Sequence, residues 1–131
     1  MAEFRTILVT GAAKRLGRAI AVALADYGWN IAIHFNSSEA AARETVEQVQ
    51  ACGRRAALLK ADLSDEDQTG ALIGRAAEAL GTITGLVNSA SIFDPDDWST
   101  ASRRSWDRHF AVNLRAPFVL SQALPWTFGV R

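Results

Sequence analysis

The sequence predicts an α/β fold of three layers (αβα), with a parallel sheet of about four strands between two layers of helices. Short apolar segments rich in β-branched residues alternate with longer segments of helical periodicity, in the order β-α-β-α-β-α-β-α. The connections between them are short, so successive strands are expected to lie parallel through right-handed crossovers. The strand segments are almost continuously apolar, as a sheet covered on both faces requires.

The first strand and helix occupy the start of the chain. Residues 5–10 (RTILVT) form an apolar run, and Gly11 ends it. The next apolar residues recur at helical spacing and are expected to share one face of a helix: Leu16, Ile20, Ala23, Leu24 and Tyr27. Gly28 stands where a left-handed C-terminal cap of this helix is expected.

The middle of the chain repeats this alternation. Residues 29–35 (WNIAIHF) are the second expected strand. Ser37 or Ser38 can cap a second helix, which is expected to run to about Ala51. Residues 55–60 (RAALLK) are the third expected strand, although alanine favours strands only weakly.

The last part of the sequence predicts one more strand between two helices. Ser64, followed by three acidic residues, is a strong N-cap for a third helix that ends near Gly81. Residues 85–88 (GLVN) are the fourth expected strand. A long final helix is expected over about residues 102–122, and Pro117 inside it should bend it.

Length and composition exclude several classes of protein. The 131 residues fit one domain, and a hydrophobic content of 49% excludes a disordered chain. Fourteen basic residues balance fourteen acidic ones, so we expect no binding to nucleic acid or to an anionic membrane surface. No signal peptide or membrane span is predicted. The single cysteine, Cys52, excludes a disulfide framework, and no metal site is predicted. These features together predict a cytoplasmic protein.

A glycine-rich turn, Gly11-Ala12-Ala13-Lys14-Arg15-Leu16-Gly17, joins the first strand to the first helix. Gly11 allows a tight turn, and Gly17 allows close packing of the helix on the strand. Free N–H groups and the helix dipole make such a turn a site for anions. The turn could equally be a plain connection, but the adjacent cations Lys14 and Arg15 favour a phosphate ligand.

With this turn, the sequence resembles the short-chain dehydrogenase/reductase family, in particular its pteridine-reductase-like branch, where arginine replaces the middle glycine. Three further motifs agree in order: Asp62-Leu63 after the third strand, Asn88-Ser89-Ala90-Ser91 after the fourth, and Asn113 in the last helix. Ser89 departs from the asparagine that is usual in the family. The resemblance covers about residues 4–124, and it implies a Rossmann-type sheet of strand order 3-2-1-4.

The end of the second strand predicts NADP(H) rather than NAD(H) as cofactor. An NAD site needs an acidic residue there for the ribose 2′-hydroxyl, but Asn36, Ser37 and Ser38 follow the strand. These side chains tolerate a 2′-phosphate, which Arg15 could contact from the glycine-rich turn. The alternative is that they form only a helix-capping loop. The branch commonly has arginine at the position of Ser37, so we expect a weaker contact with the phosphate here.

The resemblance also implies cofactor contacts beyond the glycine-rich turn. Asp62 would accept a hydrogen bond from the adenine amino group, next to Leu63. Asn88 would hold the turn beneath the cofactor ribose, next to Ala90 and Ser91. From the residues alone, Asp62 is also an ordinary loop acid ahead of a helix, and Asn88 an ordinary residue at a strand end.

Two residues are candidates on the substrate side. The resemblance implies that Phe93 stacks a substrate ring against the nicotinamide, although Phe93 could equally be a loop hydrophobe. It also implies that Asn113 is the catalytic asparagine. The sequence leaves two roles open for Asn113, which either orients a water in a proton relay or satisfies the backbone at the bend near Pro117.

The remaining polar candidates are predicted to be structural. His34 and His109 lack the spacing of metal ligands. Arg103, Arg104 and Arg108 are predicted to form a solvated face of the last helix.

The pair that would carry out proton transfer in this family, a tyrosine followed four residues later by a lysine, does not occur in the sequence. The only tyrosine is Tyr27, and the only lysines are Lys14 and Lys60. We therefore expect residues 1–131 to be a partial Rossmann domain, truncated before the catalytic residues, with little or no turnover. Full-length relatives would reduce a small carbonyl or pterin-like molecule with NADPH.

The same shortening predicts an association between chains. The fourth strand would be an exposed sheet edge, and the last helix, about residues 102–122, would bury its apolar face best in a homo-oligomer. Trp126 and Phe128 near the end would also lack cover. Two alternatives to a reductase are a non-catalytic module that binds a dinucleotide or a protein, and a non-functional fragment.

Overall fold

A computed structural model describes residues 5–125 of the chain. Strands and helices alternate in the predicted order, and the final helical region is divided into three parts. The elements are β1 (Thr6–Val9), α1 (Arg15–Asp26), β2 (Asn30–Phe35), α2 (Glu39–Ala51), β3 (Ala56–Lys60), α3 (Glu66–Leu80), β4 (Gly85–Val87), α4 (Arg103–Phe110), η1 (Ala111–Arg115) and α5 (Ala116–Ala123).

The four strands form one parallel sheet in the order β3-β2-β1-β4, which confirms the predicted fold class and strand order. Leu8 in the central strand β1 is paired with Ala32 of β2 and with Leu86 of β4. Because all strands are parallel, their carboxyl ends meet at a single edge of the sheet.

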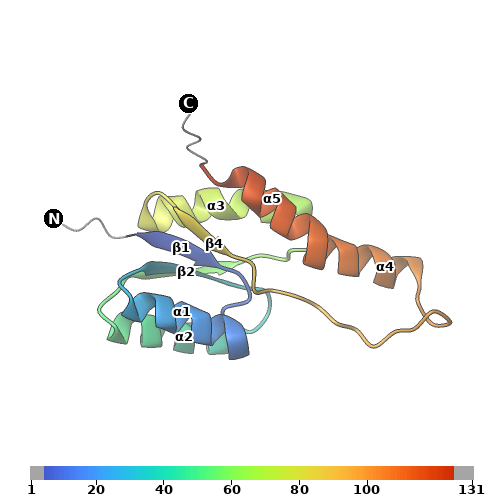
Figure 1. Ribbon diagram of the computed structural model, residues 1–131, viewed down its shortest axis with the longest axis horizontal. Helices are drawn as coiled ribbons and strands as arrows, with labels where there is room; N and C mark the ends of the chain where they lie inside the picture. Colours follow the sequence, from blue (N-terminus) through green and yellow to red (C-terminus); the bar gives the residue numbers. More distant parts are fainter. Residues whose placement is uncertain (1–4, 126–131) are drawn as a thin grey trace.

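Each face of the sheet carries its own apolar core, as the uninterrupted apolar strands require. Helices α1 and α2 cover one face, and α3 and α5 cover the other (Figure 1). Ile7 and Val9 of β1 lie in the first core, and Leu8 between them lies in the second. Leu8 and Val9 are completely buried, which places β1 at the centre of both cores.

The buried face of α1 differs from the predicted one. Gly17, Ala21 and Ala25, at intervals of four residues, are the residues that it buries. Leu16 and Tyr27, which the periodicity placed on the buried face, are 68% and 86% exposed. Ile20 and Leu24 of the predicted set do pack against the core, so the prediction holds for these two residues. Small side chains let the helix lie close to the sheet, and the apolar pattern alone did not identify them as the buried contact.

The N-cap of α3 also differs from the prediction by one residue. The cap is Asp65, whose carboxylate accepts hydrogen bonds from the backbone N–H groups of Asp67 and Gln68. Ser64 instead donates to Asp62, from both its hydroxyl and its backbone N–H. Both Ser64 and Asp65 are good capping residues, and the competing bond to Asp62 decides between them.

The last helical region is continuous along residues 103–123, and its irregular segment ends two residues before Pro117. The irregularity is a wide π turn, η1, which immediately precedes α5. Pro117 falls in the first turn of α5, where its missing N–H and fixed φ are tolerated.

Trp126 and Phe128, for which the sequence predicted a lack of cover, lie outside the described residues. Within residues 5–125, no helix is both long and apolar enough to cross a membrane.

Two glycines bring the start of α1 against the end of β1. A Cβ atom at Gly17 would lie 1.9 Å from the carbonyl oxygen of Gly11. Gly11 has φ +60°, and a Cβ there would lie 2.8 Å from the Cα atom of Ala90. Since the obstructing atoms are backbone, no side chain fits at either position without displacing the chain.

We predict that Gly17→Ala lowers the free energy of unfolding by at least about 2 kcal/mol, because the added methyl group overlaps the Gly11 carbonyl. Urea unfolding followed by circular dichroism measures the change. Gly74→Ala is the matched control, since Gly74 is also helical and a Cβ there meets nothing within 4 Å. The control is expected to gain about 0.5–1 kcal/mol in stability. Equal effects of the two substitutions would contradict the close contact at Gly17.

Candidate functional site

A pocket of about 420 Å³ opens at the carboxyl edge of the sheet. Residues from the ends of all four strands line it, together with residues from the start of α1 and from α4 and η1. Its lining residues are Gly11, Lys14, Arg15, Leu16, Gly17, His34, Asn36, Asp62, Leu63, Ser89, Ala90, Ser91, Ile92, Arg108 and Val112. Most of the predicted cofactor-binding residues therefore lie together, although they come from distant parts of the sequence.

The glycine-rich turn is held by hydrogen bonds with residues of β2, α1 and α2. The backbone N–H of Ala12 donates to the carbonyl of His34, at 3.0 Å. The hydroxyl of Thr45 donates to the Ala12 carbonyl at 2.9 Å, and the guanidinium of Arg18 donates to the Ala13 carbonyl at 3.1 Å. These bonds fix two carbonyls of the turn, so its conformation is set by the protein itself.

The turn carries two exposed cations at the start of α1. Lys14 is the N-cap residue and has no capping bond from its side chain. Arg15 adopts φ +51°, the one left-handed residue other than glycine within residues 5–125. The first N–H groups of α1 have no partner inside the helix, and the helix dipole adds positive potential there. The arrangement suits a phosphate group.

His34 connects three strand ends and proves to be a central residue of the site. Its Nδ1 atom accepts the backbone N–H of Gly11 at 3.0 Å, so the ring hydrogen is on Nε2 and is donated to the Ala61 carbonyl at 2.9 Å. The side chain is 2% exposed. Burial holds the pKa of His34 below its ordinary value, and the nearby charge of Arg75 lowers it further, against the raising effect of the bond to Ala61. His34 is therefore a neutral, structural histidine, in agreement with the interpretation from the sequence.

Thr10, which the sequence analysis did not single out, positions the segment after β4. Its hydroxyl oxygen accepts the backbone N–H groups of Ser89 and Ala90, at 3.1 and 3.0 Å. Ser89, Ala90 and Ser91 consequently face the pocket, whereas Asn88 is not among its lining residues. The sequence signal for this role of Thr10 is its position directly before Gly11, the first glycine of the turn.

At the end of β2 the structure separates the three predicted residues. Asn36 lines the pocket, but Ser37 and Ser38 do not. Ser38 is the N-cap residue of α2, and its side chain makes no capping hydrogen bond. No acidic side chain belongs to the pocket lining at this strand end, which is the position where a ribose 2′-hydroxyl would be bound in an NAD site.

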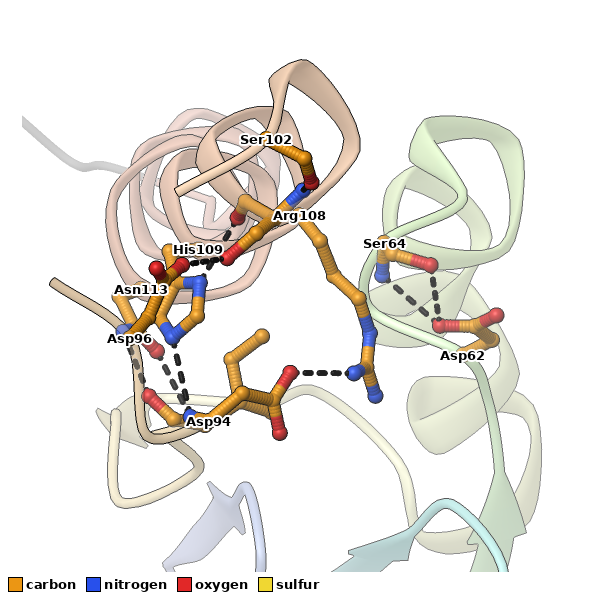
Figure 2. A network of polar contacts seen from close by, with 10 residues as sticks. Asp62, Ser64, Asp94, Asp96, Ser102, Arg108, His109 and Asn113 are labelled. Atoms are coloured by element: carbon orange, nitrogen blue, oxygen red, sulfur yellow. Dashed lines mark hydrogen bonds and ion pairs between the residues drawn. The ribbon is translucent and has the colours of Figure 1, made fainter. Parts of the chain in front are cut away.

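Asp62 follows β3, the strand that pairs with β2. Its Oδ1 atom accepts the hydroxyl and the backbone N–H of Ser64, at 2.7 and 2.9 Å (Figure 2). These bonds hold the pKa of Asp62 below its ordinary value, and the charge of Arg108 adds to the effect. Leu63 beside it is buried and contributes an apolar wall.

Asn113 binds backbone atoms, as one of the two roles left open by the sequence expects, but at a different place. Its Oδ1 atom accepts the backbone N–H of Ile92 and its Nδ2 atom donates to the Ile92 carbonyl, both at 2.9 Å. The residue thereby attaches the loop after β4 to η1, rather than satisfying the backbone near Pro117. Phe93 follows this clamp, is 85% exposed, and lines a separate hollow with Trp98.

Arg108 corrects a prediction, because it is not part of a purely solvated face. It lines the pocket, and its Nη1 atom forms an ion pair of 2.7 Å with Asp94 (Figure 2). The neighbouring His109 accepts the backbone N–H of Asp94 through Nε2, at 3.1 Å. Only Arg103 and Arg104 of the predicted cluster stay outside the pocket lining, and no sequence signal distinguishes Arg108 from them.

The comparisons with known proteins agree with this geometry. The family model of the short chain dehydrogenases matches residues 5–127. The chain belongs to that family. Among curated relatives, a hydroxynaphthalene reductase-like protein of Metarhizium guizhouense is 33% identical over 120 residues, which are 90% of this chain and 44% of that protein. A 2-dehydro-3-deoxy-D-gluconate 5-dehydrogenase of Dickeya dadantii is 36% identical, over 95% of this chain and 48% of that protein.

Solved structures of the family share the fold. A blue fluorescent protein from a metagenomic library, in complex with NADPH, has a TM-score of 0.86 and 35% identity. The match covers 91% of this chain and 49% of that one. FolM alternative dihydrofolate reductase 1 of Brucella suis, in complex with NADP, has a TM-score of 0.84 and 36% identity, with coverage of 91% and 49%. The chain thus spans about half the length of the relatives it matches.

We predict that the free energy of unfolding falls as the pH drops from about 6.5 to 5, because the unfolded chain protonates His34 near its ordinary pKa while the folded chain does not. The slope from this residue is at most about 1.4 kcal/mol per pH unit. The carboxyls of Asp62, Asp97 and Glu66, whose pKa values are lowered by bonds from Ser64, Ser99 and Arg115, contribute stability that is lost mainly below about pH 5.

Urea unfolding at several pH values measures this slope, and His34→Gln should remove it. In the wild-type chain, NMR titration of the His34 ring gives the pKa directly, so a poorly folding variant does not prevent the test. A ring that titrates at or above pH 6.5 would contradict the role assigned to burial.

Proposed function

We propose that this chain binds NADP(H) at the carboxyl edge of the sheet and forms the nucleotide-binding half of a reductase. The observation that carries the proposal is the distribution of charge around the pocket. Lys14 and Arg15 present positive charge at the start of α1, and Asn36 replaces an acidic residue at the end of β2. An acidic residue would repel the 2′-phosphate that distinguishes NADP(H) from NAD(H).

The fit of a dinucleotide rests on the shape of the glycine-rich turn. Gly17 lets the start of α1 lie against Gly11, and Gly11 lets the turn lie against Ala90, since a Cβ at either position would overlap backbone atoms. This close packing supports a turn whose free N–H groups can approach a pyrophosphate. In this proposal Arg15 donates to the 2′-phosphate beside Asn36, with Ser37 and Ser38 completing the polar surroundings. Asp62 accepts from the adenine amino group, and Leu63 packs on the base. Asn88, Ala90 and Ser91 lie toward the ribose and nicotinamide.

We further propose that the substrate is a small carbonyl or pterin-like molecule, with Phe93 as its stacking surface. NADPH, when bound, supplies the hydride for reduction of the carbon–oxygen or carbon–nitrogen double bond. Asn113 acts by holding Ile92, and with it the loop that borders the reacting end. The similarity to an alternative dihydrofolate reductase supports a pterin, whereas other relatives are named for hydroxynaphthalene or for 2-dehydro-3-deoxy-D-gluconate.

The reduction also needs a proton donor, and the 131 residues contain no tyrosine followed four residues later by lysine. We therefore propose that this polypeptide alone binds the cofactor with little or no turnover.

We predict that Arg15→Ala weakens the binding of NADPH by about tenfold or more, through loss of a charge-assisted hydrogen bond, and weakens NADH by less than about twofold. Calorimetry with both nucleotides measures the two dissociation constants. Arg43→Ala is the matched control, since Arg43 is an exposed arginine in α2 whose ion pair with Glu39 lies outside the pocket.

A reductase assay on the same preparations, with dihydropterin formation and NADPH oxidation as readouts, tests the expected lack of turnover. Equal loss of NADPH and NADH in Arg15→Ala would reject the 2′-phosphate contact. Rapid NADPH oxidation by the wild-type chain would reject the argument from the missing tyrosine and lysine.

We also propose that two copies of the chain associate through the final helical region. Trp106, Phe110, Leu114 and Phe118 recur every four residues there and are 60%, 47%, 61% and 53% exposed. The rings of Trp106 and Phe110 stack at 4.8 Å. A contiguous apolar stripe of this kind marks an interaction surface, because single scattered hydrophobic residues are the usual pattern on monomers.

We predict that Leu114→Arg shifts the chain toward monomer, because it places a charge in the centre of this stripe. Sedimentation velocity over a range of concentrations measures the distribution. Tyr27→Arg is the control, since Tyr27 is 86% exposed on α1, away from the stripe. A wild-type chain that is monomeric at every concentration would contradict the association.

A further inference from the structure

The two ends of the pocket have different chemistry. At one end, the turn before α1 offers cations and free N–H groups, which suit phosphates. At the other end, Leu63 and Val112, each 7% exposed, form apolar walls. The polar groups next to these walls are a carboxylate, Asp62, and a guanidinium, Arg108. A flat apolar ring with a polar edge fits this second end.

Arg108 reaches the pocket from α4, on the side opposite the glycine-rich turn. Its guanidinium lies between Asp94 and Asp62 in Figure 2. The ion pair with Asp94 is made by Nη1 at 2.7 Å, so the N–H groups of Nε and Nη2 are available to point elsewhere. The charge of Arg108 is close enough to Asp62 to lower the pKa of that carboxyl.

Both side chains are held in place before any ligand binds. Arg108 is held by its ion pair with Asp94, whose backbone N–H donates to Nε2 of His109. Asp62 is fixed through the two bonds from Ser64 to its Oδ1 atom. The pocket therefore presents a positioned acceptor beside a positioned donor. Preorganised groups of this kind lose little entropy on binding.

Adenine matches this pair of groups. Its edge presents an amino donor next to a ring-nitrogen acceptor. We propose that Arg108 is a further nucleotide-binding residue, whose guanidinium donates to a ring nitrogen of adenine while Asp62 accepts from the amino group. The inference rests on the proposed function, because it assumes that a dinucleotide occupies the pocket. It assigns to α4 a direct part in cofactor binding, with Asp94 as the residue that positions the guanidinium.

The test compares Arg108→Gln with the wild-type chain, using NADPH, NADH and reduced nicotinamide mononucleotide as probes. Arg108→Gln should weaken the binding of NADPH and of NADH by the same factor, about tenfold, because the adenine base is common to both. It should leave the mononucleotide, which has a phosphate but no adenine, unchanged. This pattern differs from that of Arg15→Ala, which should separate NADPH from NADH. Fluorescence titration or calorimetry gives the constants.

Arg103→Gln is the matched control, because Arg103 also forms an ion pair on α4, with Asp107 at 3.2 Å, but does not line the pocket. Asp94→Asn should weaken the binding of NADPH by a smaller factor than Arg108→Gln does. In a chain that already carries Arg108→Gln, Asp94→Asn should have no further effect, since Asp94 acts only through the Arg108 guanidinium.

The outcomes separate the inference from the proposed function. If the wild-type chain binds neither dinucleotide, the proposed function fails, and the role of Arg108 fails with it. If the wild-type chain binds NADPH and Arg108→Gln binds it as well as Arg103→Gln does, only the role of Arg108 is overturned. Loss of NADPH binding without loss of NADH binding would also overturn it, because the contact would then be with the 2′-phosphate. Equal losses for all three probes would point to a phosphate and would likewise overturn the base contact.

Discussion

The hydrogen bond from the backbone N–H of Gly11 to Nδ1 of His34 joins the elements on which the pocket depends. Through the other ring nitrogen, His34 also holds Ala61 at the end of β3. One buried ring thus sets the spacing of β1, β2 and β3 at their carboxyl ends. The bond requires a neutral imidazole, because a protonated Nδ1 could not accept the Gly11 hydrogen. Burial in the apolar interior provides that protonation state.

The pocket is a product of the parallel sheet more than of any local motif. Residues 11, 36, 62 and 90 are far apart in the sequence, yet they share one edge because every strand runs in the same direction. The Thr10 hydroxyl binds backbone atoms of two lining residues, Ser89 and Ala90, and Thr45 of α2 binds the backbone of Ala12 in the glycine-rich turn. Buried hydroxyls and the His34 ring therefore hold the backbone of the turn and of the segment after β4.

The sequence was informative where one residue type alone satisfies the backbone. Gly11 and Gly17 were predicted correctly because their surroundings admit no Cβ. The sequence was less informative where several neighbouring residues could fill the same role, as with Ser64 and Asp65, either of which could be the N-cap of α3. Arg108 could not be separated from Arg103, because the path of the loop that brings Asp94 to one arginine and not the other depends on tertiary contacts.

The wide turn η1 affects the geometry of the whole final helical region. In a regular α-helix, residues spaced by four rotate about 40° further around the axis at each step, so a stripe at this spacing winds away from a straight line. A π turn, with its i→i+5 hydrogen bonds, rotates the chain less per residue and compensates for that drift. Phe110 before the wide turn, Leu114 within it and Phe118 after it border one common groove. The alignment of this stripe therefore depends on the number of residues in η1. Deletion of one residue there would turn the side chains before η1 and those after it in different directions, although the flanking sequences would be unchanged.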